Sequence, residues 1–322
     1  MKVYSYGRTD VGVVRANNED SYGIFNLGNG GKLFVVADGL GGHLAGEVAS
    51  STAVKRLRDY LENLSGEDIK EALKVIFRRL NREIYSMGIS SPARKGMGTT
   101  LTLLYIKGNH AYIAHVGDSR VYRISGQGIE QLTQDQSFVE KLVSNGLLSE
   151  EEAKKHPRKN VLLQMIGMKK EVEPQIIGPF EIKEGDRFLL CTDGLSNLVM
   201  DREIYDVFLR LSLKEAVDFL VNLAKKRGGP DNITAIGVSV GKQLPKPTSL
   251  EETPVERPIP SQGNNLRKRK KLVLFIAIVL ILVFVFAFVY YLFTLNKKEE
   301  KLEKIEKIPA SETTVKEKQN DR

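Results

Sequence analysis

Five aspartates could together form an acidic site, because each lies beside glycine, asparagine or a turn. They are Asp20, Asp38, Asp118, Asp193 and Asp231. Three of them directly end apolar runs, in the stretches VVAD, HVGD and LLCTD. If these strand ends converge, the carboxylates repel one another unless cations lie between them. Carboxylate and carbonyl oxygens are ligands of hard ions, so the pattern predicts a Mg²⁺ or Mn²⁺ centre.

Other interpretations of the same residues are weaker. A single Asp-Gly pair is usually an ordinary turn, but five acids in such settings favour a shared site. The stretch DGLGGHLAGEVAS lacks both the ending of a phosphate-binding loop and the glycine spacing of a dinucleotide site. The single cysteine, Cys191, excludes a disulfide framework and fits a buried strand residue better than a nucleophile. No close metal-ligand spacing links the four histidines, His43, His110, His115 and His156.

The elements that must position these acids alternate between strand-like and helical stretches. Short apolar runs rich in β-branched and aromatic residues predict strands at 32–38, 99–106, 110–118, 120–124, 186–193 and 232–240. Helical periodicity predicts helices at 46–64, 67–88 and 213–227. Turns at short intervals, such as GDSR at 117–120, favour antiparallel pairing. Residues 1–241 are therefore expected to form one globular domain.

The net charge of +8 is concentrated outside that domain. Residues 1–245 carry 33 basic and 30 acidic side chains, whereas residues 246–271 carry seven and three. No nucleic-acid groove is indicated by this distribution. Half of the excess positive charge instead lies in residues 246–271, which precede a long apolar segment.

That apolar segment, residues 272–295, has no charged residue and is long enough to cross a bilayer as a helix. Tyr290 and Tyr291 lie near its far end, where an aromatic belt belongs. Residues 242–271 form a proline-rich tether that ends in the basic run RKRKK, and residues 296–322 form a charged tail. The basic flanks nearly balance, but MKVYSYGRTD lacks the pattern of a signal peptide. We therefore expect a single-pass protein of the cell membrane whose residues 1–271 are cytoplasmic, with an extracytoplasmic tail.

Eight motifs, in order along residues 1–241, resemble the metal-dependent protein phosphatase 2C (PP2C, or PPM) family of serine/threonine phosphatases, especially its compact bacterial form. The motifs are GVVRANNED (12–20), VVADGLGGHLAGEVAS (35–50), GTTLTLLYI (98–106), AHVGDSRVYRI (114–124), QLTQDQS (131–137), HPRKNVLLQMIG (156–167), LLCTDGLSNLV (189–199) and GGPDNITAI (228–236). The resemblance implies an α+β fold, a four-layer α-β-β-α sandwich of two antiparallel sheets, with a metal centre at one end.

The resemblance also implies a ligand set. Asp38 matches the residue that bridges two tightly bound metals. Asp193 and Asp231 match ligands of the first metal, and Glu19 with the Gly39 carbonyl matches those of the second.

Further positions match residues that act beside these ligands. Asp20 corresponds to a residue that holds metal-bound water, and Asp118, with Asp193, to ligands of a third, weaker metal in bacterial relatives. Arg15 corresponds to the arginine that grips the substrate phosphate, for which its planar fork is suited. Asn232 is expected to orient Asp231 or its waters.

This sequence departs from the family pattern at a few positions. Leu40 stands where many eukaryotic members have a histidine thought to protonate the leaving group. His43 is a minority candidate for that acid, and metal-bound water is the preferred one. Gln136 and Gln164 replace a histidine and an arginine on either side of residues 137–160, which resemble a mobile flap.

The reaction implied is hydrolysis of phosphoserine and phosphothreonine in proteins, by in-line attack of a hydroxide that bridges two Mg²⁺ or Mn²⁺ ions. Arg15, Asp38 and Asp193 are the expected catalytic residues. A membrane serine/threonine kinase is the partner that the family suggests. The alternative is a regulatory module that binds phosphoproteins without hydrolysing them, but such a module would have lost metal ligands that this chain retains. A structural metal-binding domain would leave Arg15 unexplained.

Overall fold

The computed structural model describes residues 1–41, 44–64 and 68–241. All of the described residues belong to one compact unit. The predicted tether, membrane helix and tail all lie outside the described residues, as does His43. No helix in the described ranges is both long enough and apolar enough to cross a membrane.

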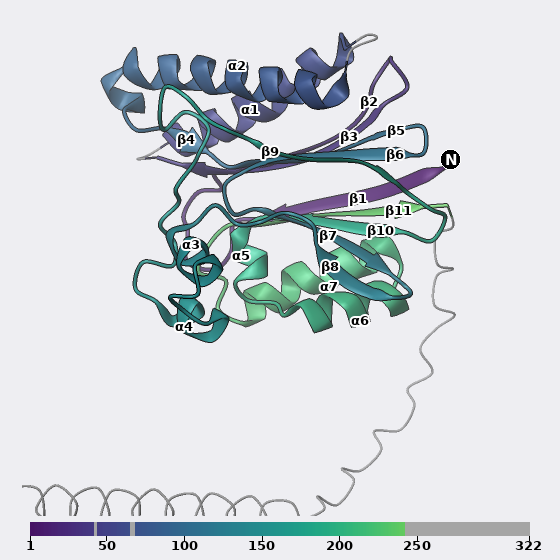
Figure 1. The fold of residues 1–322 in the computed structure, drawn as a ribbon. Helices are drawn as coiled ribbons and strands as arrows, with labels where there is room; N and C mark the ends of the chain where they lie inside the picture. Colours follow the sequence, from purple (N-terminus) through teal and green to yellow (C-terminus); the bar gives the residue numbers. More distant parts are fainter. Residues whose placement is uncertain (42–43, 65–67, 242–322) are drawn as a thin grey trace, which may run out of the picture. The chain divides into compact units, whose positions relative to one another are not determined.

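Two antiparallel sheets form the middle of the domain (Figure 1). The first sheet has the strand order β1 (Val3–Asp10), β11 (Ile233–Val240), β10 (Arg187–Cys191), β7 (Arg120–Ser125) and β8 (Gly128–Gln131). The second sheet has the order β2 (Asp20–Asn26), β3 (Lys32–Leu40), β5 (Leu101–Lys107), β6 (His110–Val116) and β9 (Gln175–Glu181), with β4 (Gly98–Thr99) paired to β3.

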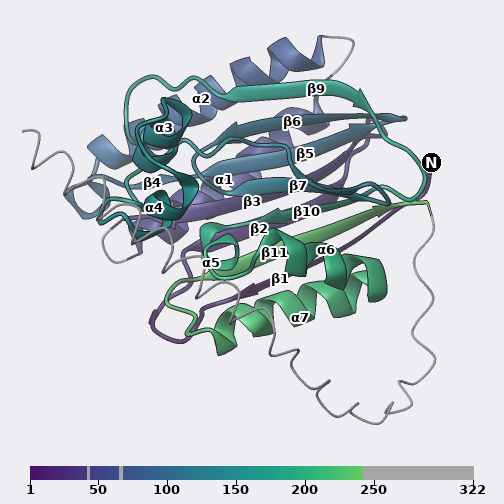
Figure 2. The same cartoon turned by 60° about the horizontal axis from the view of Figure 1, so that its bottom comes forward.

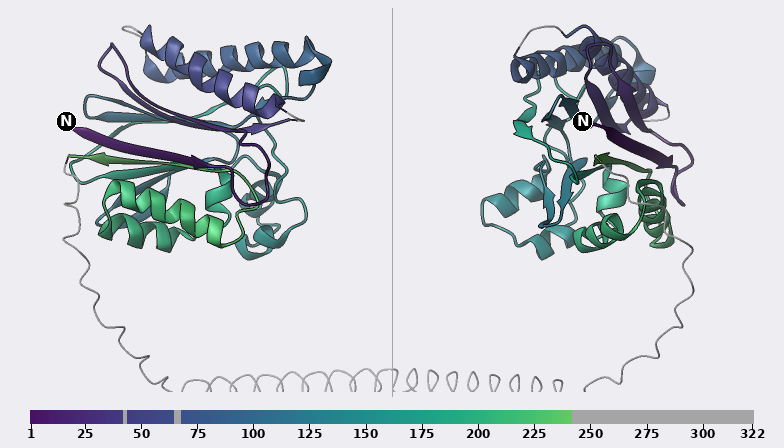
Figure 3. Two further views of the ribbon diagram at one scale, coloured as in Figure 1. Left: turned by 180° about the vertical axis from the view of Figure 1, so that it is seen from behind. Right: turned by 90° about the vertical axis from the view of Figure 1, so that its right-hand side faces the viewer.

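Each sheet is covered on its outer face by a pair of helices, which confirms the expected α-β-β-α sandwich (Figures 1 and 3). The second sheet is covered by α1 (Ala45–Glu62) and α2 (Ile69–Ile89), and the first by α6 (Asp201–Arg210) and α7 (Leu213–Lys226). Short helices occupy the connections: η1 (Pro92–Arg94), α3 (Phe138–Ser144), α4 (Glu150–Lys155) and α5 (Asp193–Ser196).

Strand β3 shows why the chain forms these layers. Successive side chains of a strand point to opposite faces of the sheet. Phe34 and Val36 therefore belong to the core between the sheets, whereas Leu33 and Val35 belong to the core beneath α1 and α2. Both faces are buried, so the strand appears in the sequence as an unbroken apolar run.

Helix ends are set by short-range capping. The Asp68 side chain accepts a hydrogen bond from the Lys70 backbone N–H (2.9 Å) at the start of α2. Ser212 and Glu215 form a reciprocal capping box at the start of α7. Such caps satisfy backbone donors that the first helical turn leaves unpaired. With these caps, α2 and α7 begin within two residues of the starts that the sequence predicts.

Strand register brings the acids to one end of the sandwich. Asp20 begins β2 directly opposite Asp38 near the end of β3, and Asp10 at the end of β1 faces Ile233 at the start of β11. At the other end Val3 faces Val240, and the Gly241 N–H donates to the Lys2 carbonyl (2.8 Å). The first and last described residues are therefore at the end opposite the acids.

The predicted flap, residues 137–160, contains α3 and α4. Both helices lie at the same end of the sandwich as α5 and β4 (Figures 1 and 2). Ser137 and Leu162 form an isolated antiparallel bridge that closes the base of this segment. The flap is thus a separate lobe at the acid-bearing end.

Candidate metal centre

The backbone of Asp38 is fixed by the two threonines of the adjoining strands. Its N–H donates to Thr100 Oγ1 (2.9 Å), and its carbonyl accepts from the Thr100 N–H (2.8 Å) and from Thr99 Oγ1 (2.9 Å). Ser119, beside Asp118, hydrogen-bonds the same Thr100 hydroxyl at 2.8 Å. Two of the predicted ligands are therefore held by one network of hydroxyl groups.

The aspartates at this end of the sandwich destabilise one another's charge. Loss of contact with water is the main cause that raises the pKa of Asp38 and of Asp118 well above the usual range, and repulsion from neighbouring aspartates adds to it. Burial likewise raises the pKa of Asp20 to about 7, although hydrogen bonds from two threonines oppose the shift. The pKa of Asp193 is also raised, first by burial and then by Asp231. A cation would relieve all of these costs together.

Two buried carboxylate oxygens lack hydrogen-bond partners. Asp20 Oδ2 accepts from Thr192 Oγ1 (2.9 Å) and Thr234 Oγ1 (2.6 Å), but Asp20 Oδ1 has no partner. Asp193 Oδ2 accepts from Asn197 (3.0 Å), and Asp193 Oδ1 has none. An unpartnered buried oxygen is costly, so each of these atoms fits a role as a ligand to a metal or its water.

Glycines make room for Glu19 beside these acids. The Gly39 N–H donates to the Glu19 carbonyl at 3.2 Å, and a Cβ at Gly39 would stand 2.3 Å from the Gly46 carbonyl oxygen. A Cβ at Gly46 would stand 2.6 Å from the Glu19 carboxylate. The glycines after Asp38 therefore let two backbone segments and one carboxylate share a space that a side chain would fill.

This set of donors fits a hard divalent cation. All of the groups are oxygens, and the side chains of Asp38, Asp118 and Asp193 keep some contact with solvent, which leaves an approach for an ion. Within the described ranges, no three acidic, histidine or cysteine side chains already stand in a ligating arrangement.

Arg15 lies against the cluster rather than away from it. Its Nη2 contacts Asp231 Oδ2 at 2.9 Å, and attraction to Asp231, Asp38 and Glu19 raises its pKa. The Arg15 side chain is 55% exposed, so it can also reach a ligand from solvent. The predicted phosphate-binding residue and a predicted metal ligand are thus direct neighbours.

Asn232 ties the loop that carries Arg15 to the loop that carries Asp231. Its Nδ2 donates to the carbonyls of Val11 (3.0 Å) and Asn17 (2.9 Å), and its Oδ1 accepts from the Glu19 N–H (2.8 Å). Its backbone N–H donates to Asp231 Oδ1 at 2.9 Å. The side chain expected to orient Asp231 therefore contacts the 11–19 segment, and the bond to Asp231 comes from the backbone.

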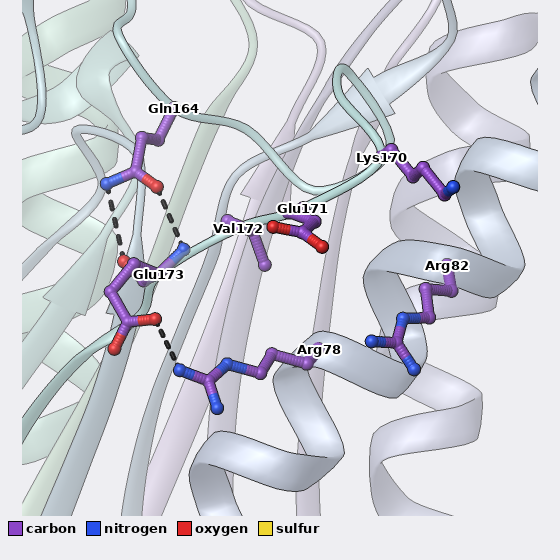
Figure 4. Close-up of a pocket in the computed structure, with 7 residues that line it drawn as sticks. All are labelled: Arg78, Arg82, Gln164, Lys170, Glu171, Val172 and Glu173. Carbon is purple, nitrogen blue, oxygen red and sulfur yellow. Dashed lines mark hydrogen bonds and ion pairs between the residues drawn. The ribbon is translucent and has the colours of Figure 1, made fainter.

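The substituted glutamines have different surroundings. Gln136 Oε1 accepts from the Gly117 N–H (3.1 Å), next to Asp118. Gln164 pairs with the backbone of Glu173 through bonds of 3.3 and 3.0 Å, in a hollow of about 430 Å³ beside α2 (Figure 4). Arg78 of α2 reaches Glu173 from the other side at 2.6 Å. Only Gln136 hydrogen-bonds a neighbour of a predicted ligand.

Cys191 and Arg120 have structural roles near the candidate site. Cys191 is buried, and burial raises the pKa of its thiol to about 12, so it stays protonated and unreactive at neutral pH. Arg120 forms a two-pronged ion pair with Asp135, with contacts of 2.7 to 3.1 Å, just after Asp118. Sequence reasoning overlooked this pair and the hydroxyls of Thr192 and Thr234, because threonine and arginine in strands carry no distinctive signal.

Comparison with known proteins supplies the context for this geometry. Residues 13–235 match the family model described as protein phosphatase 2C. The chain is 39% identical over 235 residues to a serine/threonine phosphatase stp of Listeria monocytogenes, covering 71% of this chain and 92% of that protein. It is 38% identical over 239 residues to the protein phosphatase PhpP of Streptococcus pneumoniae, covering 73% and 96%.

Solved structures agree with the sequence matches. A serine/threonine phosphatase of S. agalactiae aligns with a TM-score of 0.70 at 37% identity, covering 74% of this chain and 100% of that one. The catalytic domain of the phosphatase PstP in complex with two manganese ions aligns with a TM-score of 0.67 at 36% identity, covering 74% and 99%. These relatives are covered almost completely, so the described domain corresponds to a complete folding unit.

Proposed function

We propose a reaction and a setting for this chain, which belongs to the protein phosphatase 2C family and is a protein-serine/threonine phosphatase. The proposal is that the domain hydrolyses phosphoserine and phosphothreonine with two Mg²⁺ or Mn²⁺ ions, and that a third, weaker site involves Asp118. The observation that carries it is the set of mutually repelling carboxylates, two with unpartnered buried oxygens, directly beside Arg15.

The ligands are assigned to residues that converge at one end of the sandwich. Asp38, Asp193 and Asp231 would hold one ion, and Asp38, Glu19 and the Gly39 carbonyl the other. When bound, the ions supply a water that is nucleophilic at neutral pH and neutralise charge on the phosphoryl group. Thr192 and Thr234 hold one oxygen of Asp20, which leaves its second oxygen free to accept from a metal-bound water.

Arg15 has two partners in this proposal. In the absence of a cation it pairs with Asp231. Asp231 would release the guanidinium when its carboxylate binds a cation. Arg15 can then donate two parallel hydrogen bonds to the substrate phosphate, which stabilises negative charge on the phosphoryl oxygens as the bond to the leaving oxygen breaks.

The test uses residues 1–241, purified and stripped of metal with a chelator, and a phosphothreonine peptide. Phosphate release is expected only after Mn²⁺ or Mg²⁺ is added, and Asp193→Asn should reduce it about 100-fold or more. Asp59→Asn, an exposed substitution on α1, is the matched control and should behave as the wild type. A wild-type domain that binds the peptide but stays inactive with every metal would favour a regulatory phosphoprotein-binding module.

We also propose that residues 272–295 anchor the phosphatase as a single-pass protein of the cell membrane, with the catalytic domain in the cytoplasm. The support is the uncharged run of 24 residues and the basic sequence RKRKK before it. The full chain should float with lipid vesicles, and a chain that ends at residue 241 should not. Equal recovery of both chains in the lipid-free fraction would contradict the anchor.

The proposed partner is a membrane serine/threonine kinase whose phosphorylated residues this enzyme removes. An autophosphorylated kinase domain of that class should lose phosphate when the wild-type chain and Mn²⁺ are added, and should keep it with Asp193→Asn. Hydrolysis of peptides without hydrolysis of the folded kinase would contradict the partner while leaving the activity intact.

A further inference from the structure

Two consecutive valines are held in solvent directly before the phosphate-binding arginine. Val13 is 63% exposed and Val14 is 70% exposed. Val14 directly precedes Arg15, so the Cα atoms of the two residues lie about 3.8 Å apart on the same loop. Apolar surface kept in water beside a binding site marks a place where a partner is expected to cover it.

The backbone that presents these valines is fixed. The Val13 N–H donates to the Gly229 carbonyl (2.8 Å), and the Gly12 N–H donates to Asp10 Oδ1 (3.0 Å). Asn232 holds the carbonyls of Val11 and Asn17 on either side of the loop. The valines are therefore exposed on a preorganised loop, so binding against them costs little ordering of the protein.

A second exposed apolar pair lies in the segment that follows Asp38. Leu40 is 50% exposed, and Leu44 is 58% exposed at the start of α1. In the chain, Leu40 directly follows Gly39 and Leu44 comes two residues before Gly46, the two glycines that pack beside Glu19. Exposed apolar residues are thus close in the chain both to Arg15 and to the glycines beside Glu19.

We propose that Val14, with Val13, Leu40 and Leu44, is a specificity-determining surface that binds apolar residues next to the phosphorylated residue of a protein substrate. This inference rests on the proposed phosphatase function and adds a substrate class to it. Phosphoproteins with aliphatic residues directly beside the phosphoserine or phosphothreonine are hydrolysed in preference to those with polar neighbours.

The experiment compares two phosphothreonine decapeptides that differ only in the residues directly before and after the phosphothreonine, leucine in one and serine in the other. The readout is the ratio of kcat/KM for the two peptides, measured with residues 1–241 and Mn²⁺. Burial of one or two aliphatic side chains predicts a ratio of about five to ten for the wild type. Val14→Ser should lower that ratio about three-fold or more.

Val75→Ser is the matched control, because Val75 is 55% exposed on α2, away from the residues argued here. Its ratio should equal that of the wild type. Leu44→Ser repeats the test at the second apolar pair. If Val14→Ser does not keep the circular-dichroism spectrum of the wild type, the peptide ratio of Leu44→Ser is the deciding measurement. Serine is a good helix N-cap, so this second variant should fold.

The outcomes separate the inference from the function on which it rests. A wild-type ratio near one, or an unchanged ratio in the deciding variant, overturns the specificity surface, while hydrolysis of both peptides leaves the phosphatase function in place. Failure to release phosphate from both peptides and from p-nitrophenyl phosphate overturns the proposed function, and the inference falls with it.

Discussion

Buried carboxylates at the two ends of the sandwich differ in whether their oxygens have partners within the chain. Asp186, in the turn before β10, is 6% exposed; its carboxylate contacts Arg123 Nη2 at 2.5 Å and accepts from the Lys183 N–H at 2.8 Å. At the other end, Asp20 and Asp193 each keep a buried oxygen without a partner. The carboxylate at the first end is paired within the chain, whereas we propose that those at the second end bind an ion. We therefore expect the carboxylate at the first end to stabilise the fold and those at the second end to destabilise it.

The largest effect is expected for Asp38→Asn, which should separate activity from stability. Activity should fall about 100-fold or more, because the substitution removes the ligand that we propose both ions share. Without metal, the free energy of unfolding should rise by about 1 kcal/mol, because one of the repelling charges is removed. Urea unfolding in chelator measures the second effect, with Asp59→Asn as the control. A fall in metal-free stability would show that Asp38 is not destabilised by its neighbours.

At the opposite end, Asp186→Asn should reverse the sign of the stability change. The substitution leaves the Arg123 guanidinium, 26% exposed, without its carboxylate, and we expect a loss of about 2 kcal/mol in the free energy of unfolding. Phosphatase activity per folded molecule should stay unchanged. If Asp186→Asn and Asp38→Asn change stability in the same direction, the contrast between the two ends is wrong.

A buried base should make the domain sensitive to acid. Burial lowers the pKa of His115 to about 4, while Thr102 Oγ1 and the Gln134 carbonyl hydrogen-bond its ring. The unfolded chain binds this proton at an ordinary pKa of about 6.5, so stability is present above that pH and is lost as pH falls towards 4. Between pH 7 and pH 5 the loss should be roughly 2 kcal/mol. His115→Asn should remove this part of the pH dependence, and the exposed His110→Gln should not.

The smallest effect is expected for Thr100→Val, which removes the hydroxyl that accepts from the Asp38 N–H and contacts Ser119. Stability should fall by about 1 kcal/mol, and activity about ten-fold, because the ligand is less well positioned. Thr100→Ser retains the hydroxyl and should recover most of the activity. Wild-type activity in Thr100→Val together with a loss in Thr100→Ser would show that the methyl group, and not the hydroxyl, positions Asp38.

The sequence predicted the parts of the fold that follow from periodicity. Buried strands such as β3 and β11, and the amphipathic helices α1, α2 and α7, appear at or within two residues of their expected starts. The prediction missed β9, an edge strand that contains Pro179 and is only partly buried, because neither alternation nor propensity marks it. It also missed α5 and α6, which are short and start at caps without a strong signal.

The candidate site follows the same division. The acids were visible because carboxylates at strand ends are unusual, and register then places Asp20 opposite Asp38. The groups that hold those acids were not visible. Thr192, directly after β10, and Thr234, in β11, carry no sequence signal until the fold brings their hydroxyls to Asp20, 172 and 214 residues away in the chain. The ion pair of Arg15 with Asp231 likewise depends on a contact across 216 residues.

The pairing of the first and last described strands also makes the domain open to topological engineering. Because Gly241 hydrogen-bonds Lys2 at the end away from the acids, a short peptide could join these positions. New chain ends could then be opened at Gly126 in the β7–β8 turn, where even an added Cβ would meet open space. Such a circular permutant would carry its ends, and any tag or surface linker, at another place on the domain. Every predicted ligand would keep its place in the two sheets.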